Sequence, residues 1–282
     1  MNRTHNMIGV GIVGGIFSGL TGVGGSAILV SLMVAWLGMS QHRAQGTTPA
    51  VILPTALVGA ASYAVQGLNG QFRFDAGLAL SLIPAIALPS IAGVAIGATW
   101  MSVLPAAQLR RAFGVFLFFV ALSMLTRGIL PIGTASGQSL AIPFIFWILL
   151  GFVAGVLSGF LGIGGAMVII PFMTLGAGIP QHMTQGVSLA IIAITAIAGA
   201  YTQYRLGHVE GSAVVPMGIS SVVAVVAASL VAGQIDSFWL TKIFGLALLF
   251  FSYQFTFGST IPKPPVASSR APVDFSPGSY QI

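Results

Sequence analysis

Two short glycine-rich phrases hold the residues of this chain best suited to binding chemistry. "GLTGVGGSAILVSL" starts at Gly19, and "GFLGIGGAMVIIPF" starts at Gly159. In each phrase closely spaced glycines interrupt an apolar run, and glycine is favoured where a backbone turns sharply or approaches a ligand closely. The helix that resumes after such a break exposes backbone N–H groups with a partial positive charge. Each phrase therefore predicts a point at which backbone donors bind a small anion.

Amide and hydroxyl side chains near the two phrases supply further donors. "QGTT" at Gln45 and "QGVS" at Gln185 follow at matching distances, and each is predicted to open the next helix. Such neutral groups hydrogen-bond an oxyanion without burying a cation, and no predicted span contains a carboxylate that would favour a cation. The candidate substrate-binding residues are Ser18, Gly22, Gly24, Gly25, Ser26, Gln45, Thr47, Thr48, Ser158, Gly162, Gly164, Gly165, Gln185 and Ser188.

Purely structural roles remain open for part of this set. Glycines spaced four residues apart often serve close helix packing, which we expect at Gly15, Gly19, Gly155 and Gly159. The serine beside each pair can bond back to its own helix instead of contacting a ligand. A phosphate-binding P-loop is not expected, because the Lys-Ser/Thr ending is missing and no strand precedes the glycines.

Few titratable groups lie within reach of the apolar segments. His42 and His182 are candidate coupling residues, but their places at loop ends favour interfacial capping over a proton relay. Metal binding is not expected, because no carboxylate or thiolate accompanies them. Asp75, Glu210 and Asp236 fall at span boundaries, where we expect them to be solvated. No nucleophile–base pair is visible, so we expect neither a cofactor nor an enzyme activity.

Composition places the chain in a membrane. Hydrophobic residues make up 56% and charged residues 5%, whereas soluble domains carry about 25% charged residues. The uncharged runs between Arg3 and Arg43 and between Arg127 and Arg205 exceed the ~20 apolar residues that span a bilayer. The absence of cysteine excludes disulfide and thiol chemistry. A net charge of +6 spread over loops and termini indicates topology and not nucleic-acid binding.

The two phrases belong to an internal duplication, a common plan among transporters. A shift of 140 residues places 14–50 on 154–190, with Gln-His and Gln-Gly pairs in register. A weaker repeat relates "LRRAFGVFLFF" at Leu109 to "LTKIFGLALLF" at Leu240. We expect a first repeat at 1–130, a linker at 131–143, a second repeat at 144–260 and a disordered Pro- and Ser-rich tail at 261–282.

Each repeat is predicted to hold one glycine-broken segment followed by three spans. As a single helix, 7–37 would reach roughly 46 Å, well past a hydrocarbon core of ~30 Å. The segment must therefore fold back as a hairpin or cross once as a discontinuous span. The predicted segments are 7–37, 45–66, 76–100 and 110–128 in the first repeat, and 144–175, 185–204, 211–233 and 239–258 in the second.

The distribution of basic residues over the two sides of the membrane distinguishes these two layouts. Hairpins place seven basic residues on one side and three on the other, with Arg3 and Arg43 together. Single crossings give six and four, with Arg3 and Arg43 on opposite sides. The positive-inside tendency favours hairpins. We therefore expect an all-α polytopic membrane protein of two inverted repeats, with eight hydrophobic segments forming about ten helices, in the cell (inner) membrane with both termini cytoplasmic.

The duplicated phrases resemble the sulfite exporter TauE/SafE family of membrane permeases. "GGIFSGLTGVGGSAILVSLM", "AGVLSGFLGIGGAMVIIPFM", "AQGTTPA" and "TQGVSLA" carry the resemblance, which extends over about 7–258. It implies a carrier of small sulfur-containing anions such as sulfite, thiosulfate or sulfonates. Two departures predict unequal half-sites: Ser31 stands where the second copy has Pro171, and Val187 replaces Thr47.

We expect a secondary transporter or passive permease whose partner is a small anionic substrate, bound between the two broken segments near the bilayer midplane. Alternating access would move one half against the other. Two alternative functions stay open: a carrier of a non-sulfur organic anion or neutral solute, and a non-transporting scaffold whose glycines only pack helices. Besides the lipid bilayer, small-residue faces allow a homodimer, and no nucleic acid is expected.

Overall fold

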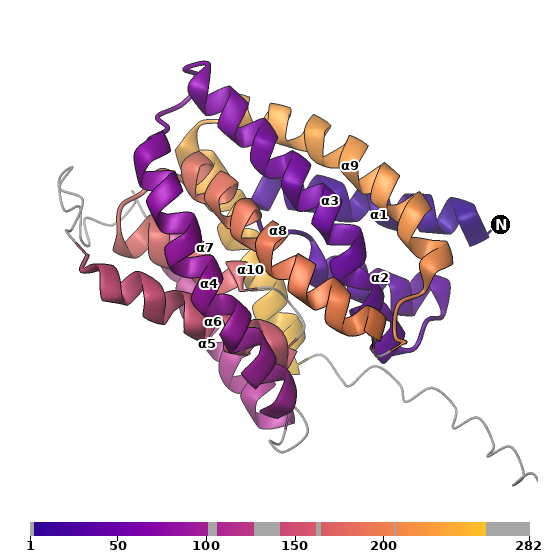
Figure 1. Ribbon diagram of the computed structural model, residues 1–282. Helices are drawn as coiled ribbons and strands as arrows, with labels where there is room; N and C mark the ends of the chain where they lie inside the picture. Colours follow the sequence, from indigo (N-terminus) through magenta and orange to yellow (C-terminus); the bar gives the residue numbers. More distant parts are fainter. Residues whose placement is uncertain (1–2, 101–105, 127–141, 162–164, 206, 258–282) are drawn as a thin grey trace, which may run out of the picture.

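The computed structural model describes residues 3–100, 106–126, 142–161, 165–205 and 207–257, and this part of the chain is α-helical without strands (Figure 1). The first half contains α1 (Arg3–Thr21), α2 (Ser26–Leu37), α3 (Gln41–Leu68), α4 (Ala76–Trp100) and α5 (Ala106–Thr126). The second half contains α6 (Phe144–Leu161), α7 (Ala166–Pro171) with the π-helical turn η1 (Phe172–Gly176), α8 (Gln181–Arg205), α9 (Gly211–Gln234) and α10 (Ser237–Phe257).

Five of these helices are long and apolar enough to cross a membrane: α3, α4, α8, α9 and α10. Shorter apolar helices, among them Ser26–Leu37 and Phe144–Gly159, fill the remainder of the bundle. The predicted fold class, an all-helical polytopic membrane protein, is therefore confirmed. Most of the predicted linker 131–143 and the tail 261–282 lie outside the described residues, and the domain boundaries stay a prediction.

Each glycine break folds the chain back on itself. A Cβ added to Gly25 would lie 2.6 Å from the carbonyl oxygen of Gly14, and one added to Gly165 would lie 2.9 Å from that of Ala154. A straight helix would separate such residues by about 16 Å, at 1.5 Å per residue. The arms of each broken segment are therefore neighbours, as a hairpin requires.

An ion-pair cluster supports the hairpin layout independently. The carboxylate of Glu210 accepts hydrogen bonds from Arg3 (3.1 Å) and Arg43 (3.3 Å). The start of α1 and the start of α3 therefore lie at the same end of the bundle. A single crossing would have placed these arginines at opposite ends. The expectation that Glu210 is merely solvated was wrong, because two distant helix starts bring arginines to it.

The two halves pack through matching contacts. Gly11 and Gly15 of α1 lie against Met217 and Ser221 of α9. The hydroxyl of Ser221 donates to the Gly11 carbonyl at 2.7 Å. In the other half, α6 packs along α4 in the same way: Gly151 and Gly155 lie against Ile86 and Ser90, and the Ser90 hydroxyl donates to the Gly151 carbonyl at 2.7 Å. This correspondence is a pseudo-two-fold relation between the repeats.

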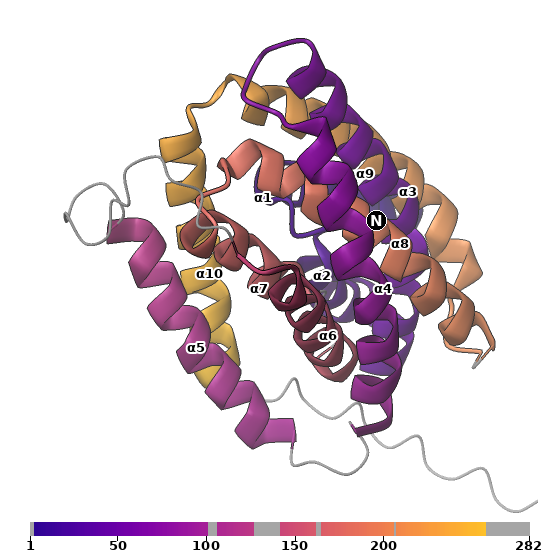
Figure 2. The same cartoon turned by 60° about the vertical axis from the view of Figure 1, so that its left-hand side comes forward.

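Equivalent helices pack against each other, α3 with α8 and α5 with α10 (Figure 2). In α3 and α8, Gly59 lies beside Leu189 whereas Pro49 lies beside Gly199, so the two helices are antiparallel. The same holds for α5 and α10, where Gly114 lies beside Thr256 and Gly245 beside Leu125. Because α3 and α8 are both long enough to span a membrane, the repeats cross it in opposite senses, which makes them inverted repeats.

The close approach of these helices depends on glycine, which gives the first testable prediction. A Cβ at Gly155 would lie 2.3 Å from the Ser90 carbonyl oxygen, whereas Gly9 has nothing within 4 Å of an added Cβ. Gly155→Val is expected to lower the free energy of unfolding by about 1–3 kcal/mol through overpacking. Gly9→Val is the control, and thermal unfolding in detergent measures both. Equal stability of the two variants would contradict this packing.

Two helices begin earlier than predicted. α3 begins at Gln41 and α8 at Gln181, whereas the predicted spans begin at 45 and 185. Ser40 explains the first start, because its hydroxyl accepts a hydrogen bond from the Arg43 N–H at 3.4 Å and so acts as an N-cap. The Gln-Gly pairs consequently lie one turn inside their helices and do not open them.

Candidate functional site

The first glycine break is a buried, left-handed turn. Gly22, Gly24 and Gly25 have φ angles of 73°, 78° and 69°, values that cost any other residue type strain. The whole break is buried, and α2 starts after Gly25 without a side-chain cap among the described residues. Irregular backbone at membrane depth is tolerated where it is buried in protein or lines a cavity. The first turn of α2 therefore presents its backbone donors inside the bundle.

Helix α8 of the second half lies against this break. A Cβ added to Gly22 would be 2.7 Å from the Cα of Gln185, and one added to Gly24 would be 3.1 Å from the Cδ1 of Ile192. Gln185, Ser188 and Ile192 are three and four residues apart, so they share one face of α8. The second repeat thus supplies residues to the break of the first repeat.

A tyrosine joins the break to α8. The hydroxyl of Tyr63 lies 2.6 Å from the Gly19 carbonyl and 2.7 Å from Oε1 of Gln185, and its single hydrogen is shared between the two. The amide of Gln185 donates to the Leu20 carbonyl at 2.9 Å. Carbonyls in the last turn of a helix lack an intrahelical partner. Tyr63 and Gln185 therefore cap the end of α1 from two other helices.

This cap changes the interpretation of Gln185 and adds a residue that sequence reasoning missed. Gln185 was expected to donate to substrate, but the structure uses one of its N–H groups and its carbonyl to hold the break. Tyr63 stands alone in an alanine-rich stretch of α3, and the duplication places Gln203 opposite it. A buried aromatic without a repeat counterpart is the signal that could have identified it.

Two buried hydroxyls flank this contact without any partner. The Oγ atoms of Ser18 and Ser188 are buried and have no hydrogen-bond partner among the described residues. Ser18 lies one turn before Gly22, and Ser188 lies one turn after Gln185. An unpaired buried hydroxyl costs free energy, and such groups often mark an absent ligand or water. The alternative that Ser18 bonds to its own helix is not found.

The other candidates of the first half take different positions. Ser26 is buried at the first position of α2, and Gln45 is half-buried. Thr48 donates to the Ala44 carbonyl of its own helix at 2.7 Å. Thr47 accepts a hydrogen bond from the Glu210 N–H at 2.9 Å, so it contacts the start of α9 and not the first break.

The second break differs from the first. Gly162 and Gly164 lie outside the described residues. Gly165 has a right-handed φ of −67°, in contrast to the left-handed Gly25. Ser158 is half-buried. The two breaks therefore differ in backbone geometry at this position.

The histidine of the second repeat caps a helix. Nε2 of His182 lies 3.1 Å from the Ala232 carbonyl and 3.0 Å from the Ile235 carbonyl, at the C-terminal end of α9. Its ring stacks on Phe72 with 4.7 Å between centroids. The side chain of His42 lies outside the described residues. Nowhere in the described ranges do three His, Asp or Glu side chains gather as metal ligands would.

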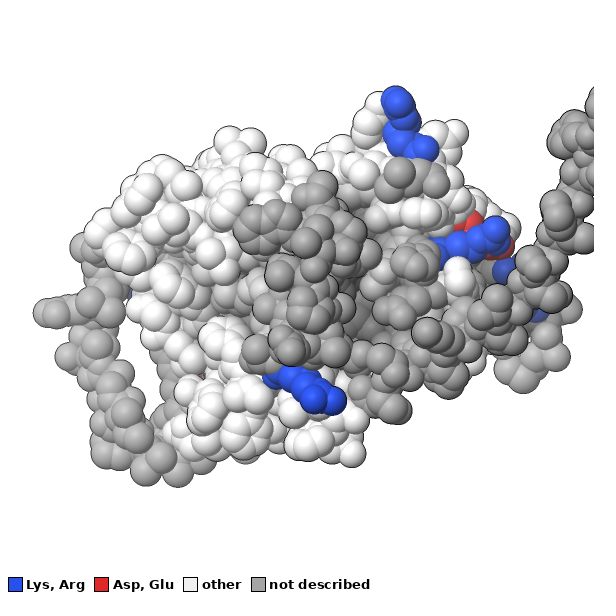
Figure 3. Space-filling view, turned by 90° about the horizontal axis from the view of Figure 1, so that it is seen from below, with Lys and Arg blue, Asp and Glu red and all other residues white. Residues whose placement is uncertain are grey.

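The charged side chains that the structure describes lie away from the break. Asp75 and Asp236 are exposed and accept hydrogen bonds from Leu78 N–H (2.9 Å) and Phe238 N–H (2.8 Å) at helix starts. Lys242 donates to carbonyls in the last turn of α5. Most of the described surface in Figure 3 carries no charge. Any anion at the break would therefore be bound by neutral donors.

Together these features define the class of protein. Two inverted repeats, apolar spans and a broken helix buried at their junction form the plan of many secondary transporters. The chain belongs to the sulfite exporter TauE/SafE family, whose model matches residues 1–124 and 147–278.

Known relatives agree with this assignment. The chain is 27% identical over 211 residues to "Probable membrane transporter protein MJ0441" of Methanocaldococcus jannaschii, covering 73% of each protein. It is 24% identical over 223 residues to "Probable membrane transporter protein YunE" of Bacillus subtilis, covering 72% of this chain and 79% of that protein. A match to "Probable membrane transporter protein YdhB" of Bacillus subtilis is 44% identical over 63 residues and covers 22% of this chain and 26% of that protein. No solved structure matches the chain.

Proposed function

We propose that this membrane transporter carries small sulfur-containing oxyanions of the sulfite, thiosulfate or sulfonate class, bound at the first glycine break. The pair of buried, unpartnered hydroxyls at Ser18 and Ser188 carries this proposal. Both flank the contact between the break and α8, beside the start of α2, which has no side-chain cap from Gly25 among the described residues. An anion placed there would receive hydrogen bonds from both hydroxyls and from backbone N–H groups.

The chemistry of the described donors favours an anion with several acceptor oxygens. Neither a carboxylate nor a basic side chain lies at the break in the described residues, so binding would depend on dipoles and hydroxyls. The family description, sulfite exporter, supports a sulfur oxyanion within this class. The transport cycle would move one repeat against the other, with the glycine break as a hinge.

A flux assay tests the substrate class. Purified protein in proteoliposomes would be offered sulfite, thiosulfate, taurine, acetate and phosphate. Flux of the sulfur anions with little acetate or phosphate flux is the expected result. Flux of carboxylates alone would favour the alternative of a non-sulfur organic anion, and no flux of any solute would favour a scaffold.

The two serines give a sharper prediction. Ser18→Ala and Ser188→Ala are each expected to raise the KM for the transported anion about tenfold, the equivalent of one lost hydrogen bond, while stability stays the same or rises. Ser221→Ala is the matched control, because its hydroxyl bonds the Gly11 carbonyl and its loss should lower stability without changing KM. Unchanged KM in both serine variants would refute the site.

We also propose an orientation in the bilayer. The end of the bundle with Arg3 and Arg43 would face the cytoplasm by the positive-inside tendency. A tag inserted between Gly38 and Gln41 would then react only from the cytoplasmic side. Labelling of intact cells with an impermeant reagent would contradict this orientation.

A further inference from the structure

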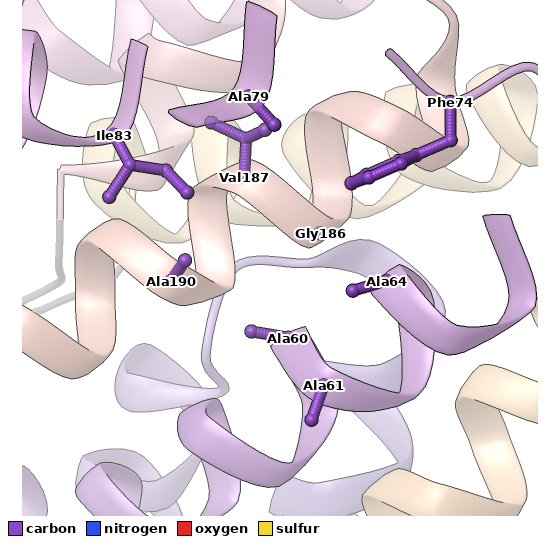
Figure 4. Close-up of a pocket in the computed structure, with 9 residues that line it drawn as sticks. All are labelled: Ala60, Ala61, Ala64, Phe74, Ala79, Ile83, Gly186, Val187 and Ala190. Atoms are coloured by element: carbon purple, nitrogen blue, oxygen red, sulfur yellow. The ribbon is translucent and has the colours of Figure 1, made fainter. Parts of the chain in front are cut away.

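Two equivalent helix–helix interfaces in this bundle, which we call seams, differ in packing. The pseudo-two-fold relation that pairs α3 with α8 and α4 with α9 also pairs the seam between α3 and α9 with the seam between α8 and α4. A cavity of about 240 Å³ opens in the seam between α8 and α4, next to α3 (Figure 4). Its lining includes Ala60 of α3, Ala79 and Ile83 of α4, and Gly186, Val187 and Ala190 of α8.

The equivalent seam between α3 and α9 is closed. A Cβ at Gly46 would lie 2.5 Å from Cβ of His208, which lies just before α9. A Cβ at the counterpart Gly186 would meet only Tyr63 of α3, at 2.9 Å, and no atom of α4 within 4 Å. Thr47, the counterpart of Val187, accepts a hydrogen bond from the Glu210 N–H at 2.9 Å. One end of the pseudo-symmetric bundle is therefore sealed where the other is hollow.

The sealed end is bound by an acidic side chain at a position where the hollow end has an alanine. Glu210 precedes Ser221 by as many residues as Ala79 precedes Ser90, so the pseudo-two-fold relation places Glu210 on Ala79. Glu210 binds Arg3 of α1 and Arg43 of α3 at 3.1 and 3.3 Å, with its side chain 17% exposed. The carboxylate thus ties the start of α9 to two other helices, and an alanine cannot do so at the hollow end.

We propose that Glu210 is the gate residue of this transporter: its bonds to Arg3 and Arg43 hold one end of the transport pathway shut while the cavity between α4 and α8 leaves the other end open. Breaking these bonds shifts the equilibrium toward the state in which the α3–α9 seam opens and the α8–α4 seam closes. The proposal concerns the conformational change during transport and not the identity of the solute, so its test is independent of the sulfur-anion assignment.

Thiol labelling tests the proposal directly, because the chain has no cysteine. Ala50 and Ala190 are equivalent, both half-buried, on the α3 and α8 faces of the two seams. In nanodiscs, where both membrane faces meet an impermeant thiol reagent, A190C is expected to react about ten times faster than A50C. Adding Glu210→Gln should raise the A50C rate and lower the A190C rate, so that the ratio falls about tenfold, as for the loss of about 1.4 kcal/mol.

Two further variants separate the loss of the ion pairs from a local disturbance of α9. Arg43→Gln breaks one of the two ion pairs without altering α9, and it should shift the ratio in the same direction. Asp75→Asn is the matched control, because Asp75 caps the start of α4 without an ion pair among the described residues. Three outcomes would overturn the proposal. The ratio is unchanged in both Glu210→Gln and Arg43→Gln, or it shifts equally in Asp75→Asn, or A190C and A50C react at equal rates without a further substitution. Size-exclusion profiles of each variant establish that it is folded.

Discussion

Gly25→Ala is expected to lower the free energy of unfolding by about 2–5 kcal/mol and to abolish transport. Gly25 has a φ of 69°, and a left-handed non-glycine residue costs about 1–2 kcal/mol. A Cβ at this position would also lie 2.6 Å from the Gly14 carbonyl oxygen, which forces the hairpin arms apart at a further cost of about 1–3 kcal/mol. The displaced arm is α2, whose first turn we place at the substrate.

Gly38→Ala separates these two contributions. Gly38 has nearly the same φ, 63°, but nothing lies within 4 Å of an added Cβ. Gly38→Ala is expected to lower the free energy of unfolding only by the conformational contribution, about 1–2 kcal/mol, and to transport normally. Chemical denaturation in mixed micelles measures stability, and proteoliposome flux measures activity. Equal losses in the two variants would show that the contact with Gly14 contributes nothing.

Tyr63→Phe is expected to reduce transport at least tenfold and to lower stability by about 1–3 kcal/mol. Removal of the hydroxyl leaves the Gly19 carbonyl and Oε1 of Gln185 buried without their donor, and an unsatisfied buried acceptor carries a penalty of that size. The end of α1 would then lose one of its two caps. Because α8 holds the break through these bonds, the substrate contacts of Ser188 should be lost with them.

A double-mutant cycle with Gln185→Leu checks that the effect passes through this network. The losses of stability in Tyr63→Phe and Gln185→Leu should be strongly non-additive, because both variants remove the hydrogen bond between these two side chains. Tyr253→Phe is the control, since Tyr253 is 67% exposed. Additive losses in the Tyr63 and Gln185 cycle, or a loss in Tyr253→Phe as large as that in Tyr63→Phe, would contradict the cap.

Much of the architecture is predictable from local patterns. Hydropathy predicts the spans, the repeat predicts two equivalent halves, and the positions of Arg3 and Arg43 favour the hairpin that the Glu210 ion pairs support. The predicted starts of α3 and α8 are too late, because the Gln-Gly pairs resemble a helix entry. The true start of α3 depends on the Ser40 cap, which lies before the predicted span.

The site is only partly predictable. The sequence indicates that the glycines break the helix and that nearby serines and amides are donors. It does not indicate that Gln185 caps α1 together with Tyr63, or that Thr47 contacts the start of α9. These contacts join residues more than a hundred positions apart, and no local pattern records which donor reaches which carbonyl.

Membrane residence, internal duplication and the position of the glycine break were determined by the sequence alone, since each depends on composition or spacing along the chain. The tertiary structure decided that α8 of the second half packs against the break of the first half. It also decided which of the two equivalent seams is closed. A near-symmetric repeat allows either seam to close. The choice rests on the residues that meet across each seam: Thr47 and Glu210 at the sealed end, Val187 and Ala79 at the hollow one.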